Sequence, residues 1–264
     1  MPEIICVANQ KGGVGKTTTA VNLSASLAAA KKRCLLVDCD PQGNATTGLG
    51  FDREGLRRGV YDLLLAGVPL TDVVRPTALA GLDLLGATTE LVGAEVELAS
   101  LDRREYRLRR GLKGLDDRYD YVFIDCPPSL GYLTVNALTA AHAVMVPLQC
   151  EYYALEGLSH LIRTIKAVKR SLNPGLRLAR IVLTMYDSRN NLSRQVAEEV
   201  RNHFRGGVFD TVIPRNVRLS EAPSHGKPAL LYDLRSTGAQ SYLALARELM
   251  ERGMEKHGKE KSTR

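Results

Sequence analysis

Hydrophobic residues along this chain fall into short runs, and segments with helical spacing of apolar positions separate these runs. Several runs are nearly continuous Val, Ile and Leu, which is typical of strands in a sheet covered on both faces. The alternation predicts an α/β fold: a doubly wound, mostly parallel sheet with helices on both faces. The predicted strands are Ile4–Ala8, Cys34–Val37, Leu82–Leu85, Tyr121–Ile124, Ala143–Pro147, Ile181–Thr184 and Thr211–Ile213. The predicted helices are Val21–Ala30, Glu105–Leu115, Gly157–Ser171, Leu192–Phe204 and Ala239–Met254.

The turn between the first predicted strand and helix is rich in glycine. Such a turn binds phosphate, because backbone N–H groups converge on the anion and the helix dipole favours its charge. Lys16 would reach the β- and γ-phosphates, and the Thr17 hydroxyl would ligate Mg²⁺. We therefore expect ATP or ADP with Mg²⁺ in this loop, bound by Lys11, Gly12, Gly13, Val14, Gly15, Lys16, Thr17 and Thr18.

The loop departs from the ordinary G-x-x-x-x-G-K-[ST] pattern at its start. Gln10 replaces the first glycine, and a second lysine, Lys11, follows it. Lys11 lies too early in the turn to duplicate Lys16 on the same nucleotide. Its simplest use is to reach a phosphate held by a partner subunit, which predicts a homodimer when ATP binds. A glycine-rich turn with two solvated lysines is the alternative, but the strand, loop, helix and downstream carboxylates occur in the expected order.

Carboxylates follow two more of the predicted strands. Asp38 and Asp40 end the strand at Cys34–Val37, and Asp125 ends the strand at Tyr121–Ile124 in the manner of a Walker B element. Ligands of doubly wound sheets bind at the carboxyl ends of strands. We expect Asp40 to orient or activate the attacking water, Asp38 to support the Mg²⁺ shell and Asp125 to hold Mg²⁺ through water. Either Asp38 or Asp40 could instead be a cap or turn residue.

The net charge of +7 is unevenly distributed. Residues 1–150 hold 16 Lys and Arg against 17 Asp and Glu, a net charge of −1, whereas residues 151–264 hold 20 against 12, a net charge of +8. A one-sided basic surface suggests a polyanionic partner such as DNA. Ordinary solubility charge is the alternative that composition leaves open.

Several classes of protein are not expected. The chain has no apolar run of about 18 residues that would cross a membrane, and no signal peptide is evident, so we expect a cytoplasmic protein. The five cysteines form no C-x-x-C pair and most lie in or beside apolar runs. They predict buried free thiols in a reducing compartment rather than disulfides or a metal site.

Five motifs together carry a family resemblance. They are the loop KGGVGKTT, VDCDPQGNATTGLG, YVFIDCPPSLG, LTMYDSRNNLS and VIPRNVRLSEAPSHGKP. They resemble the ParA/Soj family of chromosome-partitioning ATPases, which belongs to the deviant-Walker group of P-loop proteins, over nearly the whole chain. The resemblance implies a sandwich dimer with two ATP molecules between the subunits, in which Lys11 points to the partner's phosphates. It also implies nonspecific binding of the dimer to double-stranded DNA on the nucleoid. A ParB/Spo0J-type centromere-binding protein would stimulate hydrolysis and return the dimer to monomers.

The same resemblance places further residues. It puts the adenine beside Pro214, whose ring would pack on the base, and Asn216, whose amide would bond its edge. It gives Arg189 and Arg218 as DNA-facing arginines, where a planar guanidinium suits phosphate, and Lys227 as a weaker candidate. The chain is thus expected to form a single P-loop ATPase domain over residues 1–254, followed by a charged, disordered tail over residues 255–264.

Three other functions compete with partitioning. A MinD-like membrane-cycling ATPase would need an amphipathic C-terminal helix, and the charged tail lacks an apolar face. A cluster carrier like the nitrogenase iron protein would need paired cysteines at a dimer axis. A nucleotide-gated DNA-binding regulator whose hydrolysis is incidental has no sequence feature against it.

Overall fold

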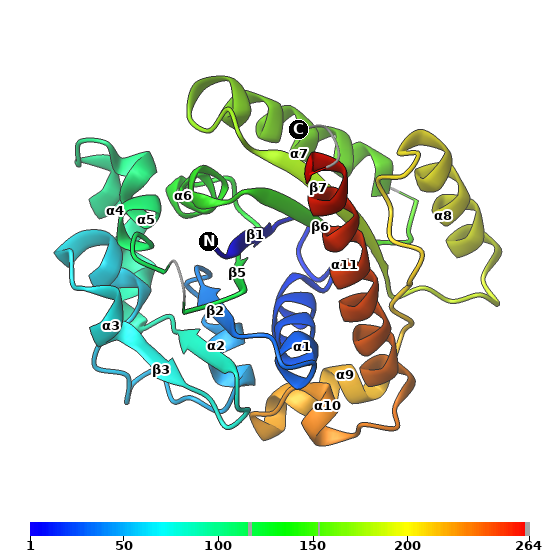
Figure 1. Ribbon diagram of the computed structural model, residues 1–264, viewed down its shortest axis with the longest axis horizontal. Coiled ribbons are helices and arrows are strands. Elements are labelled where there is room, and N and C mark those ends of the chain that lie inside the picture. The colour runs from blue at the N-terminus through cyan, green and yellow to red at the C-terminus, as the bar shows by residue number, and fades with distance from the viewer. Residues whose placement is uncertain (116–117, 153, 262–264) are drawn as a thin grey trace.

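The computed structural model describes residues 1–115, 118–152 and 154–261 (Figure 1). Its seven strands form a single sheet in the order β3-β4-β2-β5-β1-β6-β7, and every neighbouring pair is parallel except β3 and β4. The predicted doubly wound α/β fold is therefore confirmed. The strands are β1 (Glu3–Val7), β2 (Cys34–Asp38), β3 (Val74–Pro76), β4 (Leu82–Leu85), β5 (Tyr121–Asp125), β6 (Ala143–Gln149) and β7 (Arg177–Thr184).

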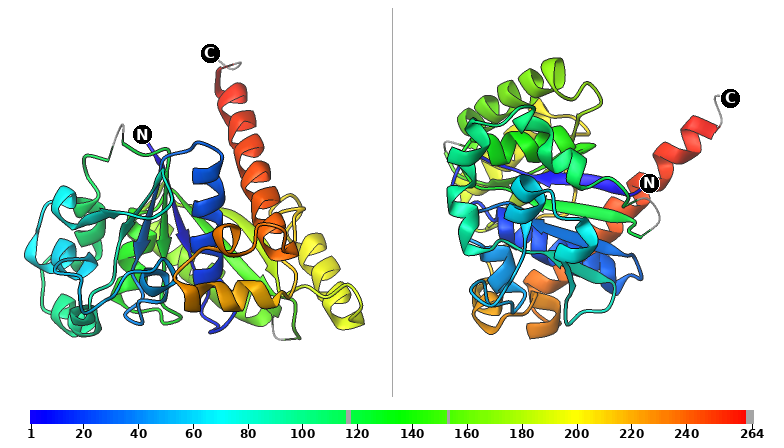
Figure 2. Two further views of the ribbon diagram at one scale, coloured as in Figure 1. Left: turned by 90° about the horizontal axis from the view of Figure 1, so that it is seen from below. Right: turned by 90° about the vertical axis from the view of Figure 1, so that its left-hand side faces the viewer.

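Helices cover both faces of the sheet (Figures 1 and 2). Alternate residues of β1 belong to two separate cores: Ile5 and Val7 pack with the α1 and α11 side chains, and Ile4 and Cys6 pack on the opposite face. Because both faces are buried, the strands need apolar residues at consecutive positions, as the sequence pattern indicated. The helices are α1 (Lys16–Ala29), α2 (Asn44–Gly48), α3 (Leu70–Val73), α4 (Ala94–Ala99), α5 (Arg107–Gly111), α6 (Tyr132–Ala140), α7 (Ala154–Ser171), α8 (Asn191–His203), α9 (Val217–Glu221), α10 (Ala229–Tyr232) and α11 (Thr237–Lys261).

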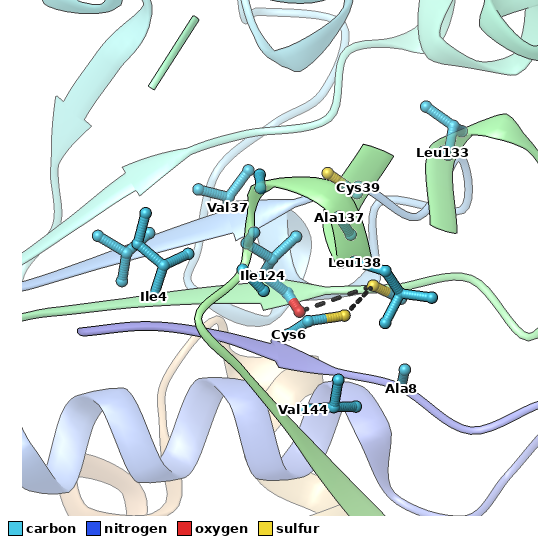
Figure 3. Close-up of a cluster of buried hydrophobic side chains, with 14 of the residues drawn as sticks. Ile4, Cys6, Ala8, Val37, Cys39, Ile124, Leu133, Ala137, Leu138 and Val144 are labelled. Atoms are coloured by element: carbon cyan, nitrogen blue, oxygen red, sulfur yellow. Dashed lines mark hydrogen bonds between the residues drawn. The ribbon is translucent and has the colours of Figure 1, made fainter. Parts of the chain in front are cut away.

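The five cysteines are buried free thiols, as predicted. Figure 3 shows Cys6 and Cys39 in the core that also contains Ala137 and Leu138 of α6. The Sγ atoms of Cys6 and Cys126 are 3.2 Å apart. The contact with Cys6, together with burial, raises the pKa of Cys126 well above its ordinary value. A protonated thiol without solvent access is a poor nucleophile. These thiols therefore act as core side chains, and no group of three or more His, Cys, Asp and Glu side chains that could hold a metal ion occurs in the described ranges.

One predicted strand is wrong and another strand was missed. Thr211–Ile213 forms no strand, although Ile213 N donates to Leu183 O of β7 at 2.8 Å. Isolated bridges flank the segment, between Ile181 and Val208 and between Tyr186 and Pro214, and they do not join into a ladder. The missed strand β3 has only three residues, ends in a proline and lies at the sheet edge, where proline is tolerated.

The last helix extends further than predicted. Helix α11 ends at Lys261, seven residues beyond Met254, where the predicted domain ends. Its Glu- and Lys-rich sequence has high helix propensity although it lacks apolar anchors. The helix therefore includes most of the segment that we predicted to be a disordered tail, and it projects past the rest of the molecule (Figure 2). Residues 262–264 lie outside the described residues. Within the described chain, no helix is both long and apolar enough to cross a membrane.

Candidate nucleotide-binding site

The glycine-rich loop joins β1 to α1 at the carboxyl edge of the sheet. Gly13 and Gly15 have φ angles of 72° and 85°, in the left-handed region that favours glycine. Two side chains that the motif does not include hold the loop in place. Asn9 Nδ2 donates to Pro147 O at 2.8 Å, and Thr184 Oγ1 donates to Val14 O at 2.9 Å. The ends of β6 and β7 thus fix the shape of the phosphate loop.

The two loop lysines occupy different environments. Lys16 is 7% exposed, and its Nζ donates to Lys11 O at 3.0 Å. Burial lowers the pKa of Lys16, while the charges of Asp125 and Asp40 oppose that shift. The Lys11 side chain is 43% exposed, and its Nζ lies 2.6 Å from Glu151 Oε2. Lys16 therefore points into the loop, whereas Lys11 faces outward and is held by Glu151. Glu151 was not identified from the sequence.

Asp125 provides a carboxylate suited to a cation. The residue is fully buried at the end of β5, and neither of its oxygens has a hydrogen-bond partner among the described residues. Burial first, and then the charge of Asp38, raise the pKa of Asp125 well above its ordinary value, while the nearby Thr17 hydroxyl and Lys16 oppose the shift. A buried unpaired carboxylate is costly unless a cation or hydrogen bonds satisfy it. Mg²⁺ prefers oxygen ligands, so Asp125 and Thr17 fit the predicted metal site.

Asp38 differs from Asp125 because its oxygens are already bonded. Oδ2 accepts from Thr46 N at 2.8 Å and from Thr46 Oγ1 at 2.6 Å, and Oδ1 accepts from Asp40 N at 3.2 Å. Burial nevertheless raises the pKa of Asp38 to about 6, against the hydrogen bonds from Thr46. These contacts give Asp38 the alternative role of a turn residue, which anchors the loop after β2 to the start of α2. Its part in the Mg²⁺ shell stays a prediction.

Asp40 lies in that same loop. It is 6% exposed, its Oδ1 accepts from Gln42 N at 2.9 Å, and its own carbonyl accepts from Gly43 N at 2.9 Å. Its charge opposes the lowering of the Lys16 pKa, so the two groups lie close enough to interact. A carboxylate held by the Gln42 N–H at this position can accept a proton from, or orient, an attacking water.

The predicted adenine residues line a small cavity. Pro214 and Asn216 meet Gly15, Thr18 and Thr184 around a volume of ≈ 100 Å³. Both ends of the Asn216 amide are engaged: Oδ1 accepts from Arg218 N at 3.0 Å and caps α9, and Nδ2 donates to Thr237 Oγ1 at 2.8 Å. A bond from this amide to a base would therefore replace the one to Thr237.

A buried tyrosine also lines the cavity beside Pro214 and Asn216. Tyr242 comes from α11, and its hydroxyl lies 3.1 Å from Thr19 Oγ1 on α1. The contact joins α1 to α11 through two residues that are 223 positions apart in the chain. No local signal could have identified Tyr242.

The predicted DNA-binding residues have acidic neighbours. Arg189 is 88% exposed and its Nη2 lies 3.0 Å from Asp187 Oδ2. Arg218 Nη1 lies 2.8 Å from Glu221, and its Nε lies 3.4 Å from Asp233. The two arginines belong to neighbouring segments, because Tyr186 and Pro214 form a β-bridge between the segments that carry them.

Lys227 lines a different cavity from Pro214 and Asn216. It lines a cavity of ≈ 300 Å³ together with Thr17 and Thr18 of α1 and Asn44 of α2. The structure thus places Lys227 beside the phosphate-binding helix. The DNA-binding roles of all three basic residues stay predictions.

An inward loop lysine, a threonine beside it and an unpaired carboxylate on the adjacent strand have the arrangement expected of the Mg²⁺-nucleotide site of a P-loop ATPase. A family model described as an AAA domain matches residues 2–178. The chain is 59% identical to the chromosome partitioning protein ParA of Myxococcus xanthus, over 94% of this chain and 88% of that protein. It is 56% identical to the sporulation initiation inhibitor protein Soj of Bacillus subtilis, over 96% of this chain and 100% of that protein. The chain belongs to the ParA/Soj family of ATPases.

A solved structure of similar fold contains a nucleotide. It is titled cobyrinic acid a,c-diamide synthase from Mycobacterium smegmatis and contains bound ADP and magnesium. That chain has a TM-score of 0.84 and 41% identity, with 96% of each chain covered. The activity in its title differs from those of the two relatives above, which share more of this sequence.

Proposed function

We propose that this chain is a chromosome-partitioning ATPase that cycles between an ATP-bound dimer on DNA and free monomers. The dimer is a sandwich with two ATP molecules between its subunits, and it binds double-stranded DNA without sequence preference. A ParB/Spo0J-type centromere-binding protein stimulates hydrolysis and thereby resets the cycle. The protein is then cytoplasmic and associated with the nucleoid.

The outward position of Lys11 carries this proposal. Its ammonium points out of the loop, whereas that of Lys16 points into it. The Lys11 side chain is flexible and 43% exposed, so it can exchange Glu151 for another anion. Exposed ion pairs contribute little stability, so the exchange costs little. A partner's phosphate, which carries more charge than one carboxylate, would make a stronger charge-assisted bond. Dimerisation and ATP binding are thereby linked.

The charge distribution supports DNA as the partner of the dimer. Arg189 and Arg218 are exposed on neighbouring segments in the half of the chain with a net charge of +8. Two copies of this surface on one dimer would contact more phosphates than a single copy. Contacts to phosphate carry no sequence information, so such binding is nonspecific.

The decisive experiment measures DNA binding without nucleotide, with ADP and with ATP, on random-sequence duplex. Binding that requires ATP, together with a dimer in size-exclusion chromatography with light scattering, supports the proposal. Lys16→Ala is the control, because loss of the loop lysine should abolish nucleotide binding and every later step. Vesicle co-sedimentation with ATP in parallel tests the membrane-cycling alternative. DNA binding that is equal in all nucleotide states contradicts the cycle.

A further inference from the structure

Arg53 makes an unusual set of contacts in the loop that follows α2. Its guanidinium donates to four backbone carbonyls: Nη2 to Pro41 O at 2.7 Å and to Thr88 O at 3.1 Å, Nη1 to Gln42 O at 2.9 Å, and Nε to Ala87 O at 3.2 Å. The side chain is half-buried. Within the described chain no carboxylate forms an ion pair with it. Arg53 thus binds a backbone conformation rather than a counter-ion.

The four carbonyls belong to two irregular segments. Pro41 and Gln42 directly follow Asp40, whereas Ala87 and Thr88 follow β4. Irregular backbone leaves carbonyls without ladder partners, and a buried carbonyl needs a donor. The five N–H groups of a guanidinium have a fixed planar arrangement and can serve several acceptors at once. Arg53 therefore ties the Asp40 loop to the neighbouring part of the molecule.

The approach of Arg53 to this loop is close. Gly43 has a φ of 66°, and a Cβ atom at this position would lie 2.3 Å from Arg53 Nε. Glycine therefore serves both the left-handed backbone and the packing of the guanidinium against it. The same loop is also held by Asp38, which accepts from Asp40 N and from Thr46. Two side chains therefore fix the Asp40 loop: the buried carboxylate of Asp38 and the half-buried guanidinium of Arg53.

We propose that Arg53 is a positioning residue for ATP hydrolysis, acting by holding the loop that carries Asp40. This inference rests on the proposed role of Asp40 in orienting the attacking water. Arg53 itself bonds only to backbone and lies outside the phosphate loop, so it contributes to the geometry of hydrolysis and not to the binding of nucleotide. A displacement of about 1 Å in a catalytic group can reduce a rate by roughly 100-fold.

The test compares Arg53→Ala, Arg53→Lys and Asp40→Ala with the wild type in steady-state ATPase assays, with fluorescent-ATP affinity measured separately. We expect Arg53→Ala to lower kcat by roughly 10- to 100-fold, while KM and fluorescent-ATP affinity change by less than about threefold, since the loop lysines are untouched. Arg53→Lys should recover part of kcat, because an ammonium can serve some of the four carbonyls. Low concentrations of guanidinium should raise kcat of Arg53→Ala and leave the wild type unchanged.

The matched control is Arg57→Ala, which removes an exposed arginine from the same loop and should leave kcat unchanged. Unchanged kcat in Arg53→Ala, or a parallel loss of kcat, ATP affinity and melting temperature without rescue by lysine or guanidinium, would overturn the positioning role. If Arg53→Ala gives one of these negative results while Asp40→Ala loses hydrolysis in the same assay, only the inference on Arg53 fails and the proposed role of Asp40 stands. If Asp40→Ala hydrolyses ATP normally, the proposed role of Asp40 is wrong and the inference on Arg53 is overturned with it.

Discussion

Asp38 and Asp125 stand opposite each other in the register of β2 and β5, yet only Asp38 has bonded oxygens. The two carboxylates therefore have different tasks at one edge of the sheet. Thr46 satisfies Asp38, and Asp125 is left for a cation. Their mutual repulsion in a buried place also raises the pKa of Asp125, so a bound cation relieves an unfavourable pair.

The first prediction separates these two tasks. Asp125→Asn should remove most of the thermal stabilisation that Mg²⁺ with ADP gives to the wild type, with little loss of stability in the metal-free protein, because its carboxylate has no hydrogen bond to lose. Asp38→Asn should lower the free energy of unfolding by about 1–3 kcal/mol, since the amide keeps only one of the two oxygens that accept from Thr46 and from Asp40 N. Melting curves with and without Mg²⁺, and with EDTA as the control, measure both effects. The assignment fails if Asp125→Asn keeps the full Mg²⁺ effect.

The second prediction concerns two adjacent glycines of the loop. A Cβ on Gly12 meets no atom within 4 Å, and the residue is exposed. Gly12→Val should therefore fold and bind ATP, but should block dimer formation, because the side chain would stand where two subunits approach. Gly13 has a φ of 72°, so Gly13→Val should be strained by about 1–2 kcal/mol and should weaken ATP binding itself. Light scattering and fluorescent-ATP titration distinguish the two variants, and dimers of Gly12→Val at wild-type yield would argue against a sandwich interface here.

The third prediction concerns pH and His142. The ring is partly exposed, and its Nδ1 accepts from Ile4 N at 3.1 Å, which only the neutral ring can do. Burial lowers the pKa of His142 from its ordinary value of 6.5; Glu3 opposes the shift, and Arg177 and Arg109 add to it. Between the folded pKa and 6.5 the unfolded chain binds more protons, so stability is complete above this window and falls as the pH falls through it.

We therefore expect the free energy of unfolding to decrease between about pH 7.5 and pH 5.5, and to decrease less in His142→Asn, which keeps an acceptor without a titrating group. Urea unfolding at a series of pH values measures the difference. An identical pH dependence in both proteins would contradict the assignment.

The strands and the phosphate loop were predictable because their signals are local. Runs of apolar residues and the glycines around Lys16 depend on backbone requirements within a few positions. The positions of Asp40 and Asp125 in the fold were also predictable, since Asp125 ends a recognisable strand and Asp40 closely follows another. The weak elements were not predicted correctly, because their local signals are poor. Strand β3 is too short to show a pattern, and Thr211–Ile213 has strand-like residues but forms no ladder.

The contacts that hold the site together could not be predicted. Glu151 lies 140 positions from Lys11, and Arg53 binds carbonyls up to 35 positions away. Neither residue belongs to a motif, because a salt bridge or a carbonyl bond imposes no periodicity on the sequence. Likewise, the hydrogen bonds that give Asp38 its alternative role as a turn residue depend on the position of Thr46 in space, which the sequence does not reveal.

The fourth prediction concerns the carboxylate that holds Arg189. Two guanidinium nitrogens of Arg189 donate to Asp187, and these bonds lower the pKa of Asp187 to about 2. Asp187 is therefore ionised at every pH at which DNA binding is measured, and it competes with phosphate for the arginine. Arg189→Ala should weaken binding to all duplexes alike, and Asp187→Asn should strengthen it, because the guanidinium is released and a charge that repels phosphate is removed.

The measurement is a salt titration of the ATP-bound protein on two unrelated duplexes. Each phosphate contact contributes a slope of roughly −0.9 in log K against log salt. Loss of one contact per subunit should flatten the slope of Arg189→Ala by about two units in the dimer, and Arg218→Ala should behave in the same way. ATP hydrolysis without DNA should be unaffected in Arg189→Ala, because Arg189 does not line the cavity formed with Pro214 and Asn216. If Asp187→Asn and Arg189→Ala shift affinity in the same direction, or if the loss is confined to one sequence, Arg189 does not make the nonspecific phosphate contact.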